Sequence, residues 1–398
     1  MLKNRDIVII GLQPWDVAIG SNCKDIAEVM SKDNRVLYVN LPMDVRQLAD
    51  NYKKSWLKKR LRYLFGRDKN LVKINDNLWN FYPPVILISA NWIPSHRIFS
   101  SINKLNNWVF ARSIKKALKK LKFKNFILFN DNDIFRGFHM KELLQPDVSV
   151  YYCRDYMMAV PYWKKHGKIL EPKLISKSDA CVANSQYLAD YCRQYNQSSF
   201  YVGQGCDLTI YDANKVKAVP ADLKEFKKPL IGYVGAITAL RLNLDWIRFV
   251  AVSRPEWNIV FIGPAEQDFK NELKSIKNVH FLGSRPVHEL PEYINAFDVC
   301  INPQLVNEVT IGNYPRKVDE YLAMKKPVVA TNTVAMKAFA EHVYLSHDRE
   351  EFLNQIDHAL MHNSESNRDL RRAFAETHTW ENSVEKIYKA ITGFEFDN

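Results

Sequence analysis

The stretch 313–331, NYPRKVDEYLAMKKPVVAT, decides how the rest of this chain is interpreted. It predicts a helix that begins at Pro315, because the missing proline N–H has no partner at a first helical position anyway. The start of a helix offers unpaired N–H groups and a positive dipole end, which favour phosphate. Lys317 lies in this first turn, and Glu320 follows on the same face. The pattern predicts a site for a diphosphate and a ribose hydroxyl, and the alternative is an ordinary amphipathic helix with a surface ion pair.

Length and cysteine usage restrict the class of protein. A chain of 398 residues exceeds one typical domain, so two domains are expected. The composition is that of a globular protein, with 47% hydrophobic and 25% charged residues. Six scattered cysteines form no C-x-x-C pair, which indicates a reducing compartment without a disulfide framework or a structural metal.

The sequence contains no pattern of a secretion signal or a membrane span. Ile7–Ile10 is an apolar run of strand length, too short for the apolar core of a signal peptide. The apolar run Val85–Ala90 is far shorter than the roughly 20 residues that a spanning helix needs. We therefore expect a cytoplasmic protein.

The positive charge is concentrated in one region. The net charge is +12, yet residues 51–124 alone carry 18 basic and 2 acidic side chains, while residues 201–398 carry a net −4. Such a local excess indicates a surface with an anionic partner.

Two basic amphipathic segments account for most of this excess. In Tyr52–Phe65, an apolar face with Trp56 at its edge is surrounded by lysine and arginine, and Phe110–Leu121 combines an apolar face with a lysine face. Such helices lie flat on anionic membranes, and the alternative is a core-facing helix with a solvated face. We favour the membrane for Tyr52–Phe65 and the core for Phe110–Leu121. Nucleic acid is not expected, because no nucleic-acid-binding fold signature accompanies the charge.

Short apolar runs alternate with helical patterns along the chain, which predicts α/β architecture with parallel sheets. Helices are expected at Asn22–Ser31 and Ser185–Tyr195, and the polar segment Val202–Lys228 is interpreted as the interdomain linker. The predicted strands are Asp6–Gly11, Arg35–Asn40, Asn125–Asn130, Ser149–Cys153, Ala180–Ala183, Leu230–Val234, Asn258–Ile262, Val279–Leu282, Val299–Ile301, Val328–Ala330 and Val343–Leu345.

Ligands of open parallel sheets bind beyond the carboxyl ends of the strands. In the second half, small or polar residues follow these ends, and a cation able to face an anion comes soon after some of them. The residues concerned are Gly235, Arg241, Gly263, Pro264, Gly283, Ser284, Arg285, Asn302 and Pro303 in the second half, and Gly11, Gln13, Pro14, Trp15 and Gly20 in the first.

Several of these segments together resemble GT-B glycosyltransferases of the broad group around family 4. The donor half carries the likeness in GYVGAI (232–237), VFIGP (260–264), NVHFLGSRPVHELPEYINAFDVCINP (278–303) and NEVT (307–310). The first half fits the acceptor side through YYCRDY (151–156), EPKLISKSDACVANSQYL (171–188) and QGCD (204–207). The likeness points to bacterial members that act in capsule, lipopolysaccharide and teichuronic-acid-type polymer synthesis.

This resemblance implies two Rossmann-like domains that face each other across a cleft. The acceptor-side domain would cover residues 1–210 and the donor domain residues 225–375, with a C-terminal helix at Trp380–Ile391, within 380–398, crossing back to the first domain.

The resemblance also implies roles for individual residues. Glu320 would bind the ribose hydroxyls of a nucleotide sugar, and Lys317 and Arg241 would meet the diphosphate. The remaining donor contacts implied are Ser284 and Arg285 near the base, Thr310, Gly312 and Asn313 near the sugar, and Gly11 and Gly20 facing the diphosphate.

The chain departs from the family pattern at three positions. Gly312 stands where a second carboxylate is usual, and Ala236 replaces an arginine of the donor loop. Asn130–Asp131 occupies the place of a common histidine, which leaves Asp131 or Asp133 as the candidate side chain at the reaction centre.

A metal-independent, retaining transfer is expected, with Arg241, Lys317 and Asp131 as its catalytic residues. Fixed positive charge would stabilise the leaving diphosphate. Asp131-Asn132-Asp133 has the form of a metal motif, but we interpret it as turn chemistry at a strand end. Inversion stays open, with Asp131 or Asp155 as the base.

The expected activity is transfer of a sugar from a nucleotide-diphosphate sugar to a membrane glycolipid or a growing surface polysaccharide. No cofactor is expected. The basic region 51–124 would hold the protein peripherally on the inner face of the cytoplasmic membrane. The alternatives are a non-catalytic partner in a polysaccharide assembly complex, motivated by Gly312 and Ala236, and a sugar-nucleotide epimerase of the same fold.

Overall fold

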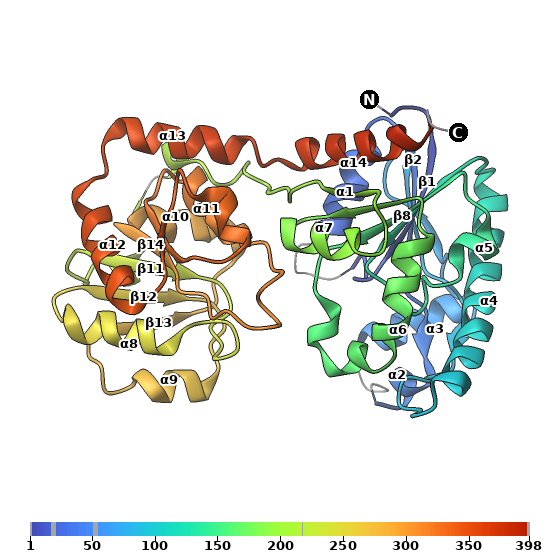
Figure 1. Cartoon of the computed structure of the whole chain (residues 1–398), viewed down its shortest axis with the longest axis horizontal. Coiled ribbons are helices and arrows are strands. Elements are labelled where there is room, and N and C mark those ends of the chain that lie inside the picture. The colour runs from blue at the N-terminus through green and yellow to red at the C-terminus, as the bar shows by residue number, and fades with distance from the viewer. Residues whose placement is uncertain (1, 17–20, 51–54, 217, 396–398) are drawn as a thin grey trace. The chain divides into compact units, whose positions relative to one another are not determined.

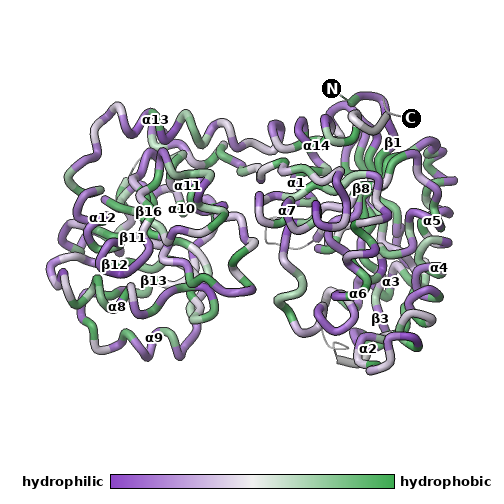
Figure 2. Tube along the Cα trace, viewed as in Figure 1, coloured by the Kyte–Doolittle hydropathy of each residue, from purple (hydrophilic) through white to green (hydrophobic). Residues whose placement is uncertain are grey.

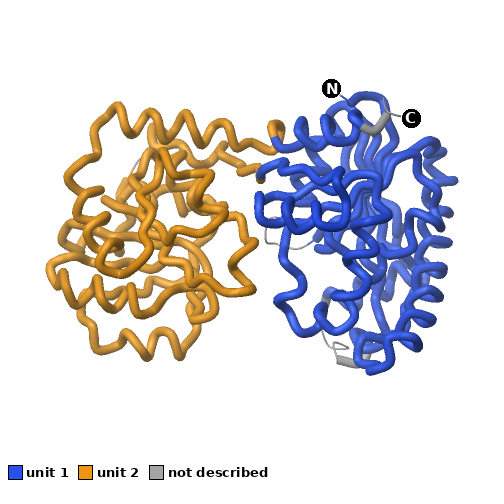
Figure 3. The backbone as a smooth tube through the Cα atoms, in the orientation of Figure 1, with its two compact units in different colours: residues 1–203, 383–398 blue, residues 204–382 orange. Residues whose placement is uncertain are grey.

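The chain folds into two compact units. The computed structural model describes residues 2–16, 21–50, 55–216 and 218–395. One unit comprises residues 1–203 with 383–398, and the other comprises residues 204–382 (Figure 3). The chain therefore passes from the first unit to the second and returns near its end.

The first unit is built on an eight-stranded sheet in the order β10-β9-β8-β7-β1-β2-β5-β4. All neighbouring strands are parallel except β4 and β5, which pair antiparallel. Two further short strands, β3 and β6, pair with each other. The strands are β1 Asp6–Gly11, β2 Arg35–Asn40, β3 Met43–Asp44, β4 Leu71–Lys73, β5 Leu78–Phe81, β6 Ile86–Leu87, β7 Ile127–Asp131, β8 Val148–Cys153, β9 Ala180–Ala183 and β10 Ser199–Tyr201.

Helices cover this sheet, as the first unit in Figure 1 shows. They are α1 Asn22–Met30, α2 Val45–Asp50, α3 Ser55–Leu64, α4 His96–Leu121, α5 Met140–Leu144, α6 Pro161–Lys177 and α7 Gln186–Arg193, with most of α14 Trp380–Glu395. The strands β1 and β8 lie in the most hydrophobic part of the unit in Figure 2, and every residue of β8 is buried. Burial on both faces is the reason that these strands appear in the sequence as continuous apolar runs.

The second unit has a six-stranded parallel sheet in the order β13-β12-β11-β14-β15-β16. Its strands are β11 Leu230–Val234, β12 Asn258–Ile262, β13 Val279–Gly283, β14 Val299–Asn302, β15 Val328–Thr331 and β16 Tyr344–Ser346. Its helices are α8 Leu244–Ser253, α9 Gln267–Leu273, α10 Leu290–Ala296, α11 Arg316–Ala323, α12 Arg349–Met361 and α13 Glu365–Glu376. Each face of this sheet has its own hydrophobic core. Val260 belongs to one core and its neighbour Phe261 to the other, because successive residues of a strand point to opposite faces.

Short 3₁₀ turns complete both units. They are Met157–Ala159, Ala213–Lys215, Ala221–Leu223, Val287–Glu289 and Ala335–Phe339.

The predicted α/β class with parallel sheets is confirmed, and each predicted strand has a counterpart in the structure. The sequence analysis missed β4, β5 and β10, together with the pair β3 and β6. These are short or lie near the sheet edges, and such strands carry little of the continuous apolar pattern.

Two local predictions need correction. The helix after Tyr314 begins at Arg316, because Pro315 has φ −86° and ψ 64°, which is not helical, and stands at the N-cap. The segment 202–228 is mostly part of the second unit, since Cys206, Tyr211 and Leu223 are buried in its core.

The cysteines carry no disulfide, as predicted. All six thiols are free and buried. Among the described residues, no helix combines the length and the apolar character that spanning a membrane requires.

Candidate functional site

The second unit has a topological switch point between β11 and β14. These central strands are neighbours, and the strand order runs in opposite directions on their two sides. Ligands of open α/β sheets bind beyond the carboxyl ends of strands at such a point. The loops that follow the two strands are joined there, since Leu305 N donates to Arg241 O at 2.8 Å and Asn307 Nδ2 donates to Leu240 O at 2.8 Å.

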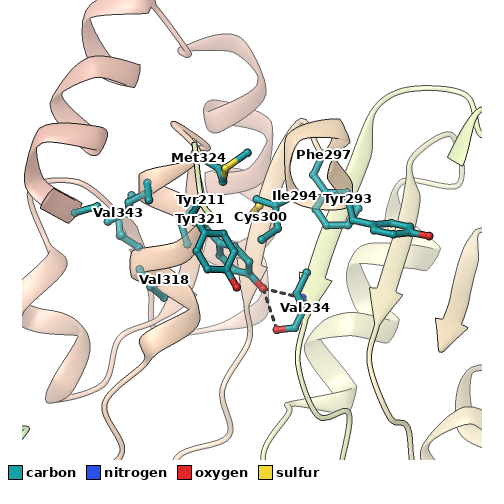
Figure 4. Close-up of a cluster of buried hydrophobic side chains, with 14 of the residues drawn as sticks. Tyr211, Val234, Tyr293, Ile294, Phe297, Cys300, Val318, Tyr321, Met324 and Val343 are labelled. Atoms are coloured by element: carbon teal, nitrogen blue, oxygen red, sulfur yellow. Dashed lines mark hydrogen bonds between the residues drawn. The ribbon is translucent and has the colours of Figure 1, made fainter. Parts of the chain in front are cut away.

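Helix α11 is fixed to the end of β11 by a tyrosine. Tyr321 is fully buried, and its hydroxyl accepts from Val234 N at 2.7 Å and donates to Val234 O at 3.3 Å (Figure 4). Burial raises the pKa of Tyr321, so the hydroxyl stays neutral and can serve as donor and acceptor at once. The first turn of α11 is thereby held beside the switch point.

Lys317 lies one turn before Tyr321 on the same helix and reaches the end of β11. Its Nζ donates to the Tyr233 hydroxyl at 2.9 Å and lies 4.6 Å from the centroid of that ring. The Tyr233 hydroxyl donates in turn to Ala236 O at 3.0 Å. The ammonium group is therefore oriented by a fixed chain of hydrogen bonds.

Gly235 makes this approach possible. Its φ is +142°, and a Cβ at this position would lie 3.0 Å from Lys317 Cε. A larger residue would be strained in the backbone and would press against the lysine. The glycine after β11 thus leaves the space that the lysine side chain uses.

Glu320 is held in a mostly buried position on α11. Its side chain is 13% exposed, Arg316 Nε lies 3.5 Å from its Oε1, and the Tyr211 hydroxyl hydrogen-bonds to it. Burial raises the pKa of Glu320, and the nearby charges of Arg316 and Lys317 oppose that rise. The carboxylate is close to two cations and keeps a small exposed surface for accepting a hydrogen bond.

Two further polar atoms near the switch point lack partners. Asn302 Nδ2, at the end of β14, and Thr238 Oγ1, in the loop after β11, are buried without a hydrogen-bond partner among the described residues. Buried polar groups are normally satisfied by protein or by bound molecules, so these two atoms mark the rim as a place for ordered water or ligand.

Comparison with known protein families identifies this unit. The model of the family "Glycosyl transferases group 1" matches residues 228–362, which include both switch-point strands and helix α11. The chain carries a group 1 glycosyl transferase domain. The predicted family and enzyme class are therefore confirmed, and the group 1 domain accounts for most of the second unit.

Whole-chain comparisons extend this result. The putative teichuronic acid biosynthesis glycosyltransferase TuaH of Bacillus subtilis is 26% identical over 279 residues, covering 64% of this chain and 70% of the relative. Sucrose-phosphate synthase from Thermosynechococcus elongatus superposes with a TM-score of 0.69 at 12% identity, over 99% of this chain and 100% of that one. Anabaena HepE, in complex with UDP and glucose, gives a TM-score of 0.65 at 14% identity, over 97% and 99% of the two chains. The predicted GT-B fold is confirmed.

The group 1 domain brings together only some of the predicted donor contacts. Lys317, Gly235 and Glu320 gather around the switch point, and Arg241 is exposed in the loop after β11. Asn313 is partly buried, and Gly312 is buried immediately before it.

The Thr310 side chain is hydrogen-bonded within its own loop. Its side chain is 2% exposed, its hydroxyl donates to Leu305 O and accepts from Asn307 N, and its carbonyl accepts from Gln304 Nε2. The Thr310 hydroxyl therefore shapes the loop after β14 and is not free to bind the sugar.

Arg285 is likewise bound within the domain. Its Nη2 pairs with Asp222 at 2.7 Å, and its Nε donates to the Tyr293 hydroxyl at 2.7 Å. The exposed Ser284 precedes it at the end of β13, and its carbonyl accepts from Arg285 Nη1 at 3.1 Å. The guanidinium is neutralised by a carboxylate, so its main visible role is to fix the turn after β13.

In the first unit, Asp131 is a fully buried partner of Arg154. Its Oδ1 accepts from Arg154 Nε at 2.7 Å and its Oδ2 accepts from Leu12 N at 3.0 Å. Burial raises the pKa of Asp131, and the charge of Arg154 opposes the rise. The side chain fixes the loop after β1 to the loop after β8.

The two neighbouring residues form the expected turn. Asp133 Oδ1 accepts from Phe135 N and Arg136 N, and Asn132 has a φ of +55°. Asx-type hydrogen bonds of this kind form a turn at the end of β7.

The two predicted glycines of the first unit have different outcomes. A Cβ at Gly11 would lie 2.1 Å from Tyr38 Oη, so this glycine is required by packing against β2. Gly20 lies outside the described residues.

The sequence analysis missed the residues that orient the predicted ones. Tyr233 positions Lys317, whereas Arg316 and Tyr211 surround Glu320. Tyr233 lies inside the quoted GYVGAI motif, so a polar group on a buried strand was the available signal. Tyr211 lies more than a hundred residues from Glu320, and no local pattern connects them.

Proposed function

We propose that this protein transfers a sugar from a nucleotide-diphosphate sugar to a membrane glycolipid or a growing surface polysaccharide. The observation that carries the proposal is the Lys317 ammonium, held at the switch point by Tyr233, with the Glu320 carboxylate on the same helix. The complex of Anabaena HepE with UDP and glucose supports a uridine nucleotide sugar as the first donor to test.

Lys317 and the N-terminal end of α11 would bind the diphosphate. Both present positive electrostatic potential, and Arg241 supplies a third positive group in the loop after β11. Glu320 would accept hydrogen bonds from the ribose hydroxyls, since its ionised form is an acceptor only. These contacts select a nucleoside diphosphate and leave the identity of the base to the loop after β13.

The transfer would break the bond between the anomeric carbon and the β-phosphate oxygen, and the electron pair would stay on that oxygen. Lys317 would stabilise this developing charge, which is the largest electrostatic change in the reaction. The acceptor hydroxyl oxygen would bond to the anomeric carbon, and its proton would pass to the departing phosphate oxygen. This path retains the anomeric configuration and requires no protein base and no metal.

The burial of Asp131 supports this path over one that uses Asp131 as base. Both of its oxygens already accept hydrogen bonds, and it is fully buried. We therefore assign Asp131 a positioning role. Asp155, whose side chain is 48% exposed and pairs with Arg154, remains the candidate base for an inverting transfer.

A lipid-bound or polymeric acceptor is supported by the relative in teichuronic acid biosynthesis and by the surface of the first unit. Helix α4 exposes Ile98, Leu105 and Trp108, followed along the same face by basic residues. Those exposed cations are Arg97, Lys104, Arg112, Lys115, Lys116, Lys119 and Lys120. Aromatic and aliphatic groups beside lysine and arginine suit the interface of an anionic membrane.

Helix α3 is the weaker membrane candidate. Its Leu57 is buried, its Lys59 and Arg60 pair with Asp16, and Arg60 also lies 4.0 Å from the Tyr82 ring. Only Trp56 and Phe65 at its two ends are exposed apolar groups. Lys53 and Lys54 of the predicted amphipathic segment lie outside the described residues. We therefore propose that peripheral attachment to the inner membrane face occurs mainly through α4.

The donor assignment is tested by calorimetric titration of the whole protein with UDP and UDP-glucose. Lys317→Ala and Glu320→Gln should each weaken binding, and Lys325→Ala is the matched control, because Lys325 follows the other end of α11 and pairs with Asp369. Undiminished nucleotide affinity in both site variants would show that the nucleotide binds elsewhere. A panel of other nucleoside diphosphates then identifies the base.

A further inference from the structure

The first unit contains a concave site whose lining includes none of the residues that we assign to the donor site or to the reaction. It has a volume of about 180 Å³. It is formed by the segment 87–92, which starts in β6, by the end of β3 and the start of α2, by the N-terminal half of α4, by the loop after β7 and by Tyr162 of α6. This is below the roughly 300–1,000 Å³ of pockets that hold drug-sized ligands, which suits one sugar ring rather than a chain of them.

The walls of the pocket are fixed by hydrogen bonds. Asn106 of α4 exchanges two bonds with the Ile88 backbone, at 2.8 and 2.9 Å, and Ser89 Oγ donates to Asp44 Oδ1 at 2.8 Å. Asn91 Nδ2 donates to Tyr162 O at 2.6 Å, and Asn103 Nδ2 donates to Phe135 O at 3.0 Å. The cavity is therefore preformed, which lowers the entropic cost of binding.

Aromatic rings make up much of the lining. Phe99 and Phe135 are buried, whereas Trp92 is 68% exposed and Tyr162 is 51% exposed. The Trp92 Nε1 donates to Ser89 O at 2.8 Å, which fixes the indole while leaving much of it exposed. The negative face of an aromatic ring attracts weakly positive C–H groups, such as those on one face of a sugar ring.

Polar groups of balanced charge complete the pocket. Arg46 and Asp44 contribute one charge of each sign, and Arg136 is paired through its Nε with the buried Asp133 at 3.1 Å. Burial raises the pKa of Tyr162, and the charges of Arg136 and Arg46 oppose the rise while that of Asp44 adds to it. The Tyr162 hydroxyl thus stays neutral among hydrogen-bonding groups. A balanced set of this kind matches hydroxyl groups and gives no excess charge for a free anion.

We propose that this pocket binds one uncharged sugar residue of the acceptor. This rests on the proposed function for the choice of acceptor over other glycans. Trp92 and Ile88 line the pocket, and both are exposed. The Ile88 backbone is hydrogen-bonded to Asn106 of α4. Asn106 lies in the sequence between Leu105 and Trp108, the exposed apolar residues of that helix. The sugar pocket consequently adjoins the apolar face that we assign to the membrane, as a glycolipid headgroup would require.

The experiment uses the full-length protein in two arms. In the first, saturation-transfer NMR measures binding of the methyl glycosides of glucose, mannose and N-acetylglucosamine. In the second, sedimentation measures binding to phosphatidylglycerol vesicles with and without monoglucosyldiacylglycerol. The variants Trp92→Ala and Arg46→Ala change the pocket, and Tyr195→Ala is the control, an exposed aromatic residue of the first unit outside both the lining and α4.

We expect sugar-dependent binding that falls roughly tenfold in each pocket variant, the usual effect of losing one well-placed contact, and that is unchanged in Tyr195→Ala. Binding of the free glycosides assigns the pocket to the sugar itself. Sugar-dependent binding in the vesicle arm alone assigns it to a lipid-presented headgroup.

Absence of sugar-dependent binding in both arms overturns the proposal, as does an equal loss in Trp92→Ala and Tyr195→Ala. UDP affinity is measured in parallel on every variant and should stay unchanged. If the parent protein does not bind UDP, the donor assignment is refuted while the pocket result still stands. Failure of the donor assignment and failure of the pocket proposal are therefore distinguishable.

Discussion

Lys317 Nζ donates a hydrogen bond of 2.9 Å to the Tyr233 hydroxyl and lies 4.6 Å from the centroid of the same ring. A lysine side chain has several rotatable bonds, and fixing it costs conformational entropy when a ligand binds. The tyrosine holds the ammonium at the carboxyl end of β11 before any ligand is present. The cation of the donor site is therefore preorganised by a strand residue, not by the helix that carries it.

Replacing this tyrosine should weaken nucleotide binding without unfolding the protein. In Tyr233→Phe the ring stays and the hydroxyl bonds to Lys317 and Ala236 O are lost. One such bond contributes about 1 kcal/mol, so UDP affinity should fall roughly fivefold. Titration calorimetry measures the change, and the exposed Tyr195→Phe is the control. An unchanged Kd in Tyr233→Phe would mean that Lys317 does not act from this orientation.

The space at Gly235 is a second requirement. Gly235→Ala places a Cβ at a φ of +142°, 3.0 Å from Lys317 Cε. Such backbone strain costs on the order of 1–3 kcal/mol, so both thermal stability and UDP affinity should fall. Gly393→Ala is the matched control, because its Cβ would meet nothing within 4 Å in helix α14 and should raise stability slightly. Equal melting temperatures for the two variants would contradict the conformational role of Gly235.

Glu320 predicts a pH dependence of donor binding. Burial raises its pKa above the ordinary 4.5, with Arg316 and Lys317 opposing. The ionised form that accepts from ribose is lost as the pH falls through this raised pKa, so UDP binding should weaken on that acid limb. Glu320→Gln should bind UDP more weakly at neutral pH, and its UDP affinity should no longer fall at acid pH. Calorimetry between pH 5 and 8 measures the affinity of the parent protein and of the variant. A fall in affinity at acid pH that persists in Glu320→Gln would mean that another group causes it.

The same shift has the opposite sign for stability. The folded protein holds the Glu320 proton more tightly than the unfolded chain, so this contribution to stability is present at low pH and is lost as the pH rises through the folded pKa. Glu320→Gln should therefore leave the unliganded protein equally or more stable at pH 7. Urea unfolding measures the free energy of unfolding. A clear destabilisation of Glu320→Gln would show that the interactions of the carboxylate stabilise the fold by more than its burial destabilises it.

Asp131 distinguishes a positioning role from proton transfer. Asp131→Asn removes the buried counterion of Arg154 and leaves it only the half-exposed Asp155, and breaking a buried pair costs about 3–5 kcal/mol. We expect a large fall in unfolding free energy, measured by urea titration. The exposed pair Lys73 and Asp76 provides the control, since Asp76→Asn should have little effect. Full stability of Asp131→Asn together with lost sugar transfer would restore Asp131 as the base.

Membrane attachment should depend on α4 more than on α3. Leu105→Ser with Trp108→Ala removes two exposed apolar groups of α4, and Trp56→Ala removes one from α3. Flotation with phosphatidylglycerol vesicles should show a large loss for the first variant and a small one for the second. Added salt should weaken binding by the parent protein, because the basic residues act through screened charges. A greater loss in Trp56→Ala would return the assignment to α3.

The sequence by itself determined the α/β class and most of the strands. Buried parallel strands such as β1, β9 and β11 are apolar on both faces, so the local sequence is enough to predict them as strands. The glycines and cations after these strands also carried a usable signal, because carboxyl ends of parallel strands meet on one edge. Lys317 and Glu320 follow instead from the helix start in the stretch 313–331, and the family resemblance implies their roles.

Only the tertiary structure decided what those residues do. Pairing between Lys317 and Tyr233, or between Glu320 and Tyr211, joins side chains that lie far apart in sequence. The same is true of Arg285, which Asp222 neutralises, and of Asp131, which Arg154 holds in the interior. Local patterns give the chemistry of a side chain, whereas its exposure and its partners depend on segments folded against it. The opening stretch 313–331 thus specified a cation and a carboxylate on one helix, and the fold decided that one is held at the switch point and the other is nearly buried.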